Sequence, residues 1–137
     1  MKFQRPKVLT YQEAIRFHGH NGPFLALGYR LGEHLSKRLR SKGIMDLKIT
    51  VKCKTAKPFT CLIDGLQCST FATFGKGNMK MQRCMRGDIT VLVEKRRGRY
   101  IYKITKNAMN ICLTATDLER AARKILRTPA KDLWKVR

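Results

Sequence analysis

The sequence predicts an α+β domain, with a small, mainly antiparallel sheet and helices packed on one face. Apolar residues recur at helical spacing early in the chain, and alternating apolar and polar residues indicate strands in the middle. A further helical stretch lies near the C-terminus. The order helix, helix, strand, helix, strands, helix is typical of helices gathered on one side of such a sheet.

The first two helices are expected on either side of a glycine. Thr10 and Glu13 form the pattern of a capping box, which predicts a helix that ends at Gly19. A second, longer helix is expected from Pro23 to about residue 39, because proline is preset for the first helical turn. Its apolar stripe consists of Leu25, Leu27, Leu31, Leu35 and Leu39.

The rest of the chain predicts a sheet with one inserted helix. Strands are expected at 47–53, 79–84, 88–94 and 100–105, with residues 95–99 as a basic hairpin loop, and a helix from residue 60 to the turn at 75–78. A helix at 117–126, introduced by Thr114 or Thr116, would precede a short final helix that begins at Thr128-Pro129 and ends at Leu133-Trp134. Trp134 is expected to anchor this C-terminal segment in the apolar core.

Composition indicates a single domain over residues 1–137, including C-terminal helices at about 115–137. The hydrophobic fraction of 43% is sufficient for a core. No apolar stretch reaches the roughly 18 residues of a membrane span, and no apolar signal region follows the N-terminus, so we expect a cytoplasmic protein without membrane contact. Five cysteines without a C-x-x-C pair argue against a disulfide framework, a zinc ribbon and a thioredoxin-like motif.

The strongest signal in the composition is positive charge. There are 30 lysines and arginines against 9 acidic residues, which gives a net charge of +21. Such a charge attracts nucleic acid, acidic proteins or multiply charged small ligands. The basic residues are spread along the chain and form no single block, which is also typical of a solvated surface. Nucleic-acid binding is therefore an alternative that the sequence does not favour.

The candidate site begins with His18-Gly19-His20. Imidazole is a common metal ligand and a common general acid or base, and Gly19 gives the backbone freedom to turn both rings toward one point. Cys61, Asp64 and Cys68 share one face of the helix expected after residue 60. Imidazole and thiolate are ligands that zinc prefers. The alternatives are two solvated histidines in a turn, and cysteines that are simply small buried side chains.

Three separated motifs resemble the FmdE family, which is named after formylmethanofuran dehydrogenase. They are Phe17-His18-Gly19-His20-x-Gly22-Pro23 continuing to Arg30, then Cys61-x-x-Asp64-x-x-Gln67, then Thr73-Phe74-Gly75-Lys76-Gly77-Asn78. The resemblance covers about residues 11–105. It implies an α+β core, an intertwined homodimer and a metal or catalytic pocket near the His-Gly-His turn, in a protein associated with one-carbon metabolism.

The resemblance also implies roles for particular residues. His18, His20 and Cys61 would hold zinc. Asp64 and Lys76 are the predicted catalytic residues. Arg30 and Asn78 are the predicted residues for binding a cofactor or another anionic small molecule.

The chain departs from the family pattern at two thiols. Gly22 stands where the family usually has a cysteine, and Phe71-Ala72-Thr73 replaces Gly-Cys-Thr. Cys53 and Cys68 are additional thiols that could compensate. The chain lacks the cysteines of the C-terminal zinc finger found in some members, so we expect the core domain alone. The missing thiols also suggest a second alternative, a non-catalytic dimeric ligand-binding or scaffold protein.

Overall fold

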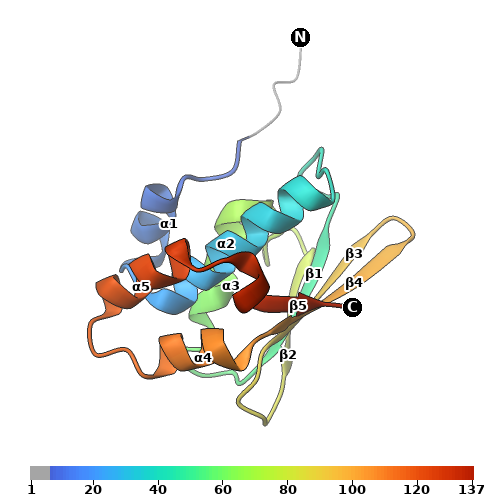
Figure 1. Cartoon of the computed structure of the whole chain (residues 1–137). Helices are drawn as coiled ribbons and strands as arrows, with labels where there is room; N and C mark the ends of the chain where they lie inside the picture. Colours follow the sequence, from blue (N-terminus) through green and yellow to red (C-terminus); the bar gives the residue numbers. More distant parts are fainter. Residues whose placement is uncertain (1–6) are drawn as a thin grey trace.

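A computed structural model describes residues 7–137. Figure 1 shows the helices gathered on one side of a sheet, which confirms the predicted α+β class. The helices are α1 (Tyr11–His18), α2 (Pro23–Arg38), α3 (Cys61–Thr70), α4 (Lys106–Leu113), α5 (Leu118–Arg127) and the 3-10 helix η1 (Ala130–Asp132). The strands are β1 (Lys48–Cys53), β2 (Met79–Arg83), β3 (Thr90–Lys95), β4 (Gly98–Ile104) and β5 (Trp134–Val136). None of the helices in residues 7–137 is long and apolar enough to cross a membrane.

The sheet has the order β2-β1-β3-β4-β5, and only the β1–β2 pair is parallel within the described residues. A parallel pair needs a crossover connection, and α3 provides it between β1 and β2. Ile49, Val51 and Cys53 alternate with less buried residues along β1, so one face of the strand meets the core. The β3–β4 hairpin turns at Arg96 and Arg97, within the predicted basic loop.

Helices α2 and α3 approach each other at their backbones. A Cβ on Gly28 would lie 2.0 Å from the Leu62 carbonyl oxygen, and one on Gly65 would lie 2.3 Å from the Leu25 carbonyl oxygen. Both distances are far below van der Waals contact. Glycine at these two positions is therefore what allows the helices to pack this closely.

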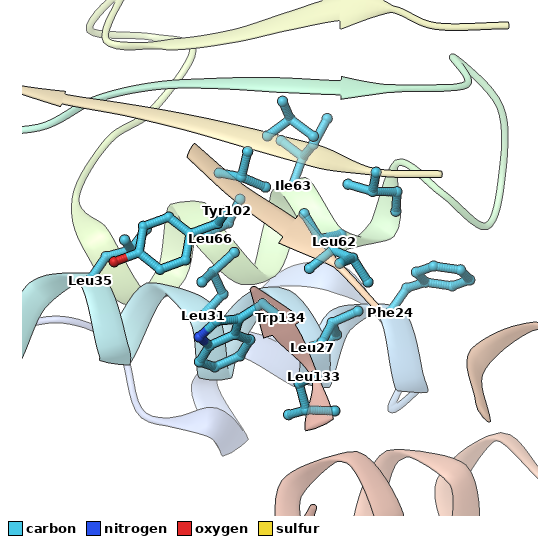
Figure 2. Packing of buried hydrophobic residues seen from close by; sticks show 14 of the residues in the cluster. Phe24, Leu27, Leu31, Leu35, Leu62, Ile63, Leu66, Tyr102, Leu133 and Trp134 are labelled. Carbon is cyan, nitrogen blue, oxygen red and sulfur yellow. The ribbon is translucent and has the colours of Figure 1, made fainter. Parts of the chain in front are cut away.

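The core lies between these helices and the sheet. Figure 2 shows leucines of α2 and α3 facing Tyr102 of β4 and Trp134 of β5. Trp134 is 4% exposed, which confirms that it anchors the C-terminal segment. The guanidinium carbon of Arg30 lies 5.9 Å from the Trp134 ring, close enough for a cation–π contact.

The C-terminal third differs from the sequence prediction in three ways. Helix α4 was not predicted; Thr105 caps it by accepting a hydrogen bond from the Ala108 N–H. Helix α5 is capped by Asp117, and not by Thr114 or Thr116. The predicted final helix is only the 3-10 turn η1, because Trp134 enters strand β5 and pairs with Ile104. Residues 1–6, on which the expectation of no export signal rests, lie outside the described residues.

The contact between α2 and α3 can be tested with Gly28→Ala. The added methyl group would meet the Leu62 carbonyl, so we expect a loss of at least about 2 kcal/mol in the free energy of unfolding, measured by urea titration. Gly87→Ala is the control, because no atom lies within 4 Å of a Cβ there. Equal stability of the two variants would contradict the proposed role of the glycine contact.

Candidate functional site

The two histidines of the motif lie on either side of the end of α1. Thr10 and Glu13 form the predicted capping box at the start of this helix. Gly19 ends it with a left-handed φ of 103°, and its N–H donates to the Ile15 carbonyl at 2.7 Å. His18 is thus the last helical residue and His20 follows the turn. Their ring centroids lie 4.6 Å apart.

A hydrogen bond joins His18, at the end of α1, to Asp64 of helix α3. The His18 Nδ1 and the Asp64 Oδ2 are 2.6 Å apart, and the two side chains are 10% and 34% exposed. Within residues 7–137, no other histidine, lysine or arginine lies at salt-bridge distance from a carboxylate. Because an ionised carboxylate only accepts hydrogen bonds, it favours the tautomer with a proton on Nδ1 and leaves Nε2 free to bind a metal or accept a proton.

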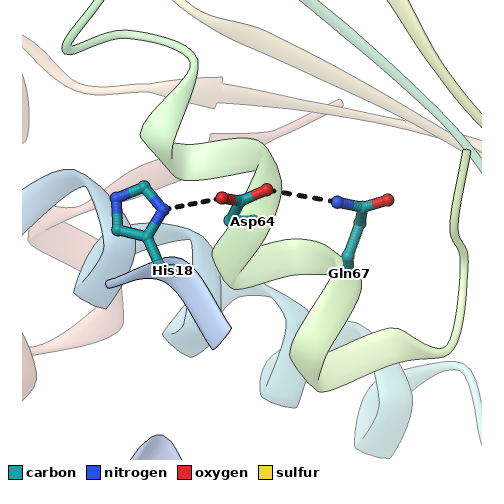
Figure 3. A network of polar contacts seen from close by, with 3 residues as sticks. All are labelled: His18, Asp64 and Gln67. Atoms are coloured by element: carbon teal, nitrogen blue, oxygen red, sulfur yellow. Dashed lines mark hydrogen bonds and ion pairs between the residues drawn. The ribbon is translucent and has the colours of Figure 1, made fainter. Parts of the chain in front are cut away.

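Gln67 extends this network, as Figure 3 shows. Its Nε2 donates to the Asp64 Oδ1 at 3.3 Å, and its Oε1 accepts from the Phe74 N–H at 3.0 Å. Gln67 was part of the sequence motif but was not predicted as a site residue. Its position three residues after Asp64, on the same helical face, is the signal that could have identified it.

The His18 Nε2 is buried and has no hydrogen-bond partner. In Figure 3 this nitrogen points away from Asp64. A buried polar atom without a partner is uncommon in folded proteins, and one explanation is that the atom binds a ligand or ion. Asp64 therefore holds one nitrogen of the His18 ring, while the other nitrogen is left without a partner.

A cavity of about 340 Å³ lies beside this network. His18, Cys61, Asp64 and Gln67 line it together with apolar side chains that include Phe74 and Met81. The cavity lies within the size range of small-molecule sites. The sequence prediction missed Lys57 and Thr60, which precede α3 and also line the cavity, and Met81, which comes from the edge strand β2. No local sequence pattern identifies Met81, because its place depends on how the sheet pairs.

Cys61 begins α3 and opens onto the same cavity. Burial raises the pKa of its thiol, and the negative charge of Asp64 raises it further, while Lys57 acts in the opposite direction. The thiol is therefore neutral at pH 7. Cys68, on the same helix, instead packs in a separate cluster with Ala14 and Tyr29, where burial raises its pKa to about 11. Cys53 is fully buried in β1, so neither additional thiol lines the cavity.

His20 is exposed and does not line the cavity. Desolvation lowers the pKa of its imidazole, and the charge of His18 lowers it further. A Cβ on Gly22 would lie 3.0 Å from the His20 Nε2, so the glycine leaves room for this ring where the family pattern has a cysteine. Within residues 7–137, no group of three or more His, Cys, Asp or Glu side chains is arranged to hold a metal ion.

The other predicted binding residues make internal contacts. The Arg30 guanidinium donates to the Ile125 carbonyl at 3.0 Å and to the Thr128 carbonyl. The Lys76 ammonium donates to the Phe71 carbonyl and to the Thr73 hydroxyl. Neither side chain lines the His18 cavity, so the structure does not bring them to His18, Asp64 and Cys61.

The turn at Gly75-Lys76-Gly77 also directs its backbone inward. The Lys76 N–H donates to the Thr73 hydroxyl and the Gly77 N–H donates to the Phe74 carbonyl. Asn78 is 2% exposed; its amide donates to the Ile44 and Leu47 carbonyls and accepts from the Thr73 N–H, at 3.0 to 3.1 Å. These contacts join the turn to the start of β1.

We expect Asn78→Ala to act on stability. It would leave the partly buried Thr73 N–H and two carbonyls without their partners, at a cost of at least about 2 kcal/mol in the free energy of unfolding. Asn110→Ala, at an exposed position of α4, is the control and should change stability by less than about 0.5 kcal/mol. Asn78→Ala protein with the stability of the wild type would contradict this structural role.

The comparison with known proteins agrees with the motifs. No curated protein matches the chain. The family described as FmdE, Molybdenum formylmethanofuran dehydrogenase operon, matches residues 17–135, which include the His18 turn, all of α3 and all of the sheet except Val136. Since this match covers most of the chain, the protein belongs to the FmdE family.

Proposed function

We propose that the chain binds a zinc ion at the cavity beside His18, and that this is its functional centre within the formylmethanofuran dehydrogenase context of its family. The observation that carries the proposal is the His18 ring: Asp64 holds Nδ1 while the buried Nε2 has no partner. A carboxylate on the far nitrogen is the usual support of a metal-binding histidine, because it fixes the tautomer and raises the basicity of the ligand.

Cys61 and His20 are the proposed companion ligands. Cys61 lines the cavity with His18, and the His20 ring lies next to the His18 ring. The three side chains do not form a ready-made cluster, so zinc binding in this proposal requires the companion side chains to reorient toward His18. When bound, zinc supplies a Lewis acid that polarises an oxygen of a bound ligand. Asp64 and Gln67 would keep His18 in place during such chemistry.

The thiol gives the proposal a pH dependence. Zinc binds the thiolate, and the pKa of Cys61 is raised by burial and by Asp64. A proton must therefore leave Cys61 when zinc binds, so affinity should increase as pH rises. The lowered pKa of His20 acts in the favourable direction, since it keeps this imidazole neutral at pH 7.

A second candidate is a metal-free ligand pocket. The absence of a ready-made ligand cluster within residues 7–137 favours it. Here the His18 Nε2 would accept a proton or a hydrogen bond from a small ligand, and Asp64 would stabilise the resulting imidazolium. The proposed homodimer is independent of this choice and can be tested by light scattering of the purified protein.

Metal content distinguishes the two candidates. Tag-free protein incubated with zinc and then desalted should retain about one equivalent per chain by elemental analysis, while His18→Ala and His20→Ala should retain less than about one-tenth. His34→Gln is the matched control, because His34 packs against Tyr102 and Trp134 and does not line the cavity. Wild-type protein without zinc, or equal uptake by all variants, would contradict the metal proposal and favour the metal-free pocket.

Cysteine alkylation gives a readout that does not depend on retention during desalting. Zinc should slow the alkylation of Cys61 in the wild type, because a thiolate that binds the ion is no longer free to react with the alkylating reagent. Cys84 is also partly buried but does not line the cavity, so its rate should stay the same. Equal slowing at both cysteines would indicate a general effect of zinc on the fold.

A further inference from the structure

Helix α5 presents a cationic face on the side away from the core. Arg120, Arg123, Lys124 and Arg127 follow the spacing i, i+3, i+4 and i+7, which places them on one side of a helix. All four are exposed. The buried residues of α5 are Ala121, Ala122 and Ile125, and the helix packs against α2. The sequence alone gave no sign of such a face, because the basic residues are spread along the whole chain.

The four cationic side chains line a groove of about 920 Å³, which we call the α5 groove. The end of α4 and the linker to α5 complete it, with Thr114, Thr116 and Thr128 among its lining residues. Figure 1 shows α4 and α5 joined by this linker. The cations thus lie along a concave surface that can receive an extended ligand.

The α5 groove holds one acidic side chain, Asp117, against its four cations. Within residues 7–137, no carboxylate lies within salt-bridge distance of any of the four cations. The Asp117 side chain, which lies at the groove, accepts from the Arg120 backbone N–H as the helix cap. Four like charges on one helix face repel each other, and the net charge of +21 adds to this repulsion. An anionic ligand would relieve it.

We propose that the α5 groove binds the phosphate backbone of double-stranded nucleic acid. From the first to the last of the four cations the helix rises by about 10 Å, so the four form one short row of positive charge that can face neighbouring phosphates of one strand. Three of the four are arginines, whose planar group suits bidentate contact with phosphate. No aromatic side chain of the described residues lines the groove, so it lacks the stacking platform typical of single-strand binding. This surface goes beyond the proposed zinc site and shares no lining residue with the His18 cavity.

Backbone binding predicts a particular salt dependence. A mixed-sequence duplex DNA of roughly 20 base pairs serves as the probe, and fluorescence anisotropy gives its affinity over a range of salt concentrations. Replacing all four cations, as Arg120→Gln, Arg123→Gln, Lys124→Gln and Arg127→Gln, should reduce the steepness of log K against log salt by about 3 to 4. Affinity at about 0.1 M salt should fall at least roughly 100-fold.

The chain offers a control with the same loss of charge. Lys80, Arg83, Arg86 and Arg97 are exposed and lie outside the α5 groove, and they also comprise one lysine and three arginines. Their replacement by glutamine should change the slope by less than about 1. Equal losses in the two variants would show that net charge, and not the groove, drives binding, and would overturn the proposal. So would the absence of duplex binding by the wild type.

Two further measurements separate the remaining explanations. Polyglutamate of matched charge, or vesicles of anionic lipid, should compete poorly with the duplex; equal competition would overturn the assignment to nucleic acid. In the unmodified protein, duplex DNA should slow acetylation of Lys124 and leave Lys80 unaffected. This readout holds even if the fourfold variant fails to fold, and equal protection of both lysines would contradict the proposal.

Discussion

The close approach of α2 and α3 is the constraint on which the rest of the structure depends. Gly28 and Gly65 allow the two backbones to meet where any side chain would collide with a carbonyl. Helix α2 follows directly after the His-Gly-His turn, and α3 carries Cys61 and Asp64 on its first turn. The distance between these helices therefore determines whether Asp64 can reach His18. Helix α3 is also the crossover between the parallel strands β1 and β2, and Met81 of β2 lines the cavity beside it.

Much of the fold could be predicted because its signals are local. The capping box of α1, the proline that begins α2 and the alternation along β1 each concern a few consecutive residues. The errors lie where tertiary contacts decide the structure. Trp134 follows a turn that resembles a helix start, but pairing with Ile104 and burial in the core draw it into β5. Helix α4 was missed because its cap gives a weaker signal: Thr105 is followed three residues later by Ala108, where α1 has the Glu13 of its capping box.

The site was predictable in part for a related reason. His18 and Asp64 lie 46 positions apart, and no periodicity in the sequence connects them. The family resemblance placed both residues in motifs around one pocket, and the structure shows the hydrogen bond between them. The resemblance also suggested functional roles for Arg30, Lys76 and Asn78, whose side chains the structure engages in internal contacts. Residues of one sequence motif can thus serve two purposes. Some line the cavity, while others hold the turns and the C-terminal segment around it.

The proposed function depends most on the His18 ring, which Asp64 orients so that Nε2 is free for a metal ion or ligand. Nitrogen-15 NMR of the imidazole tests this directly, because the two ring nitrogens give different shifts when protonated and unprotonated. In the neutral imidazole of the metal-free protein, we predict that the proton lies on Nδ1 and not on Nε2, and that the Nε2 signal changes when zinc is added. A proton on Nε2 in place of Nδ1, or a ring that zinc leaves unchanged, would contradict the proposed zinc site at His18.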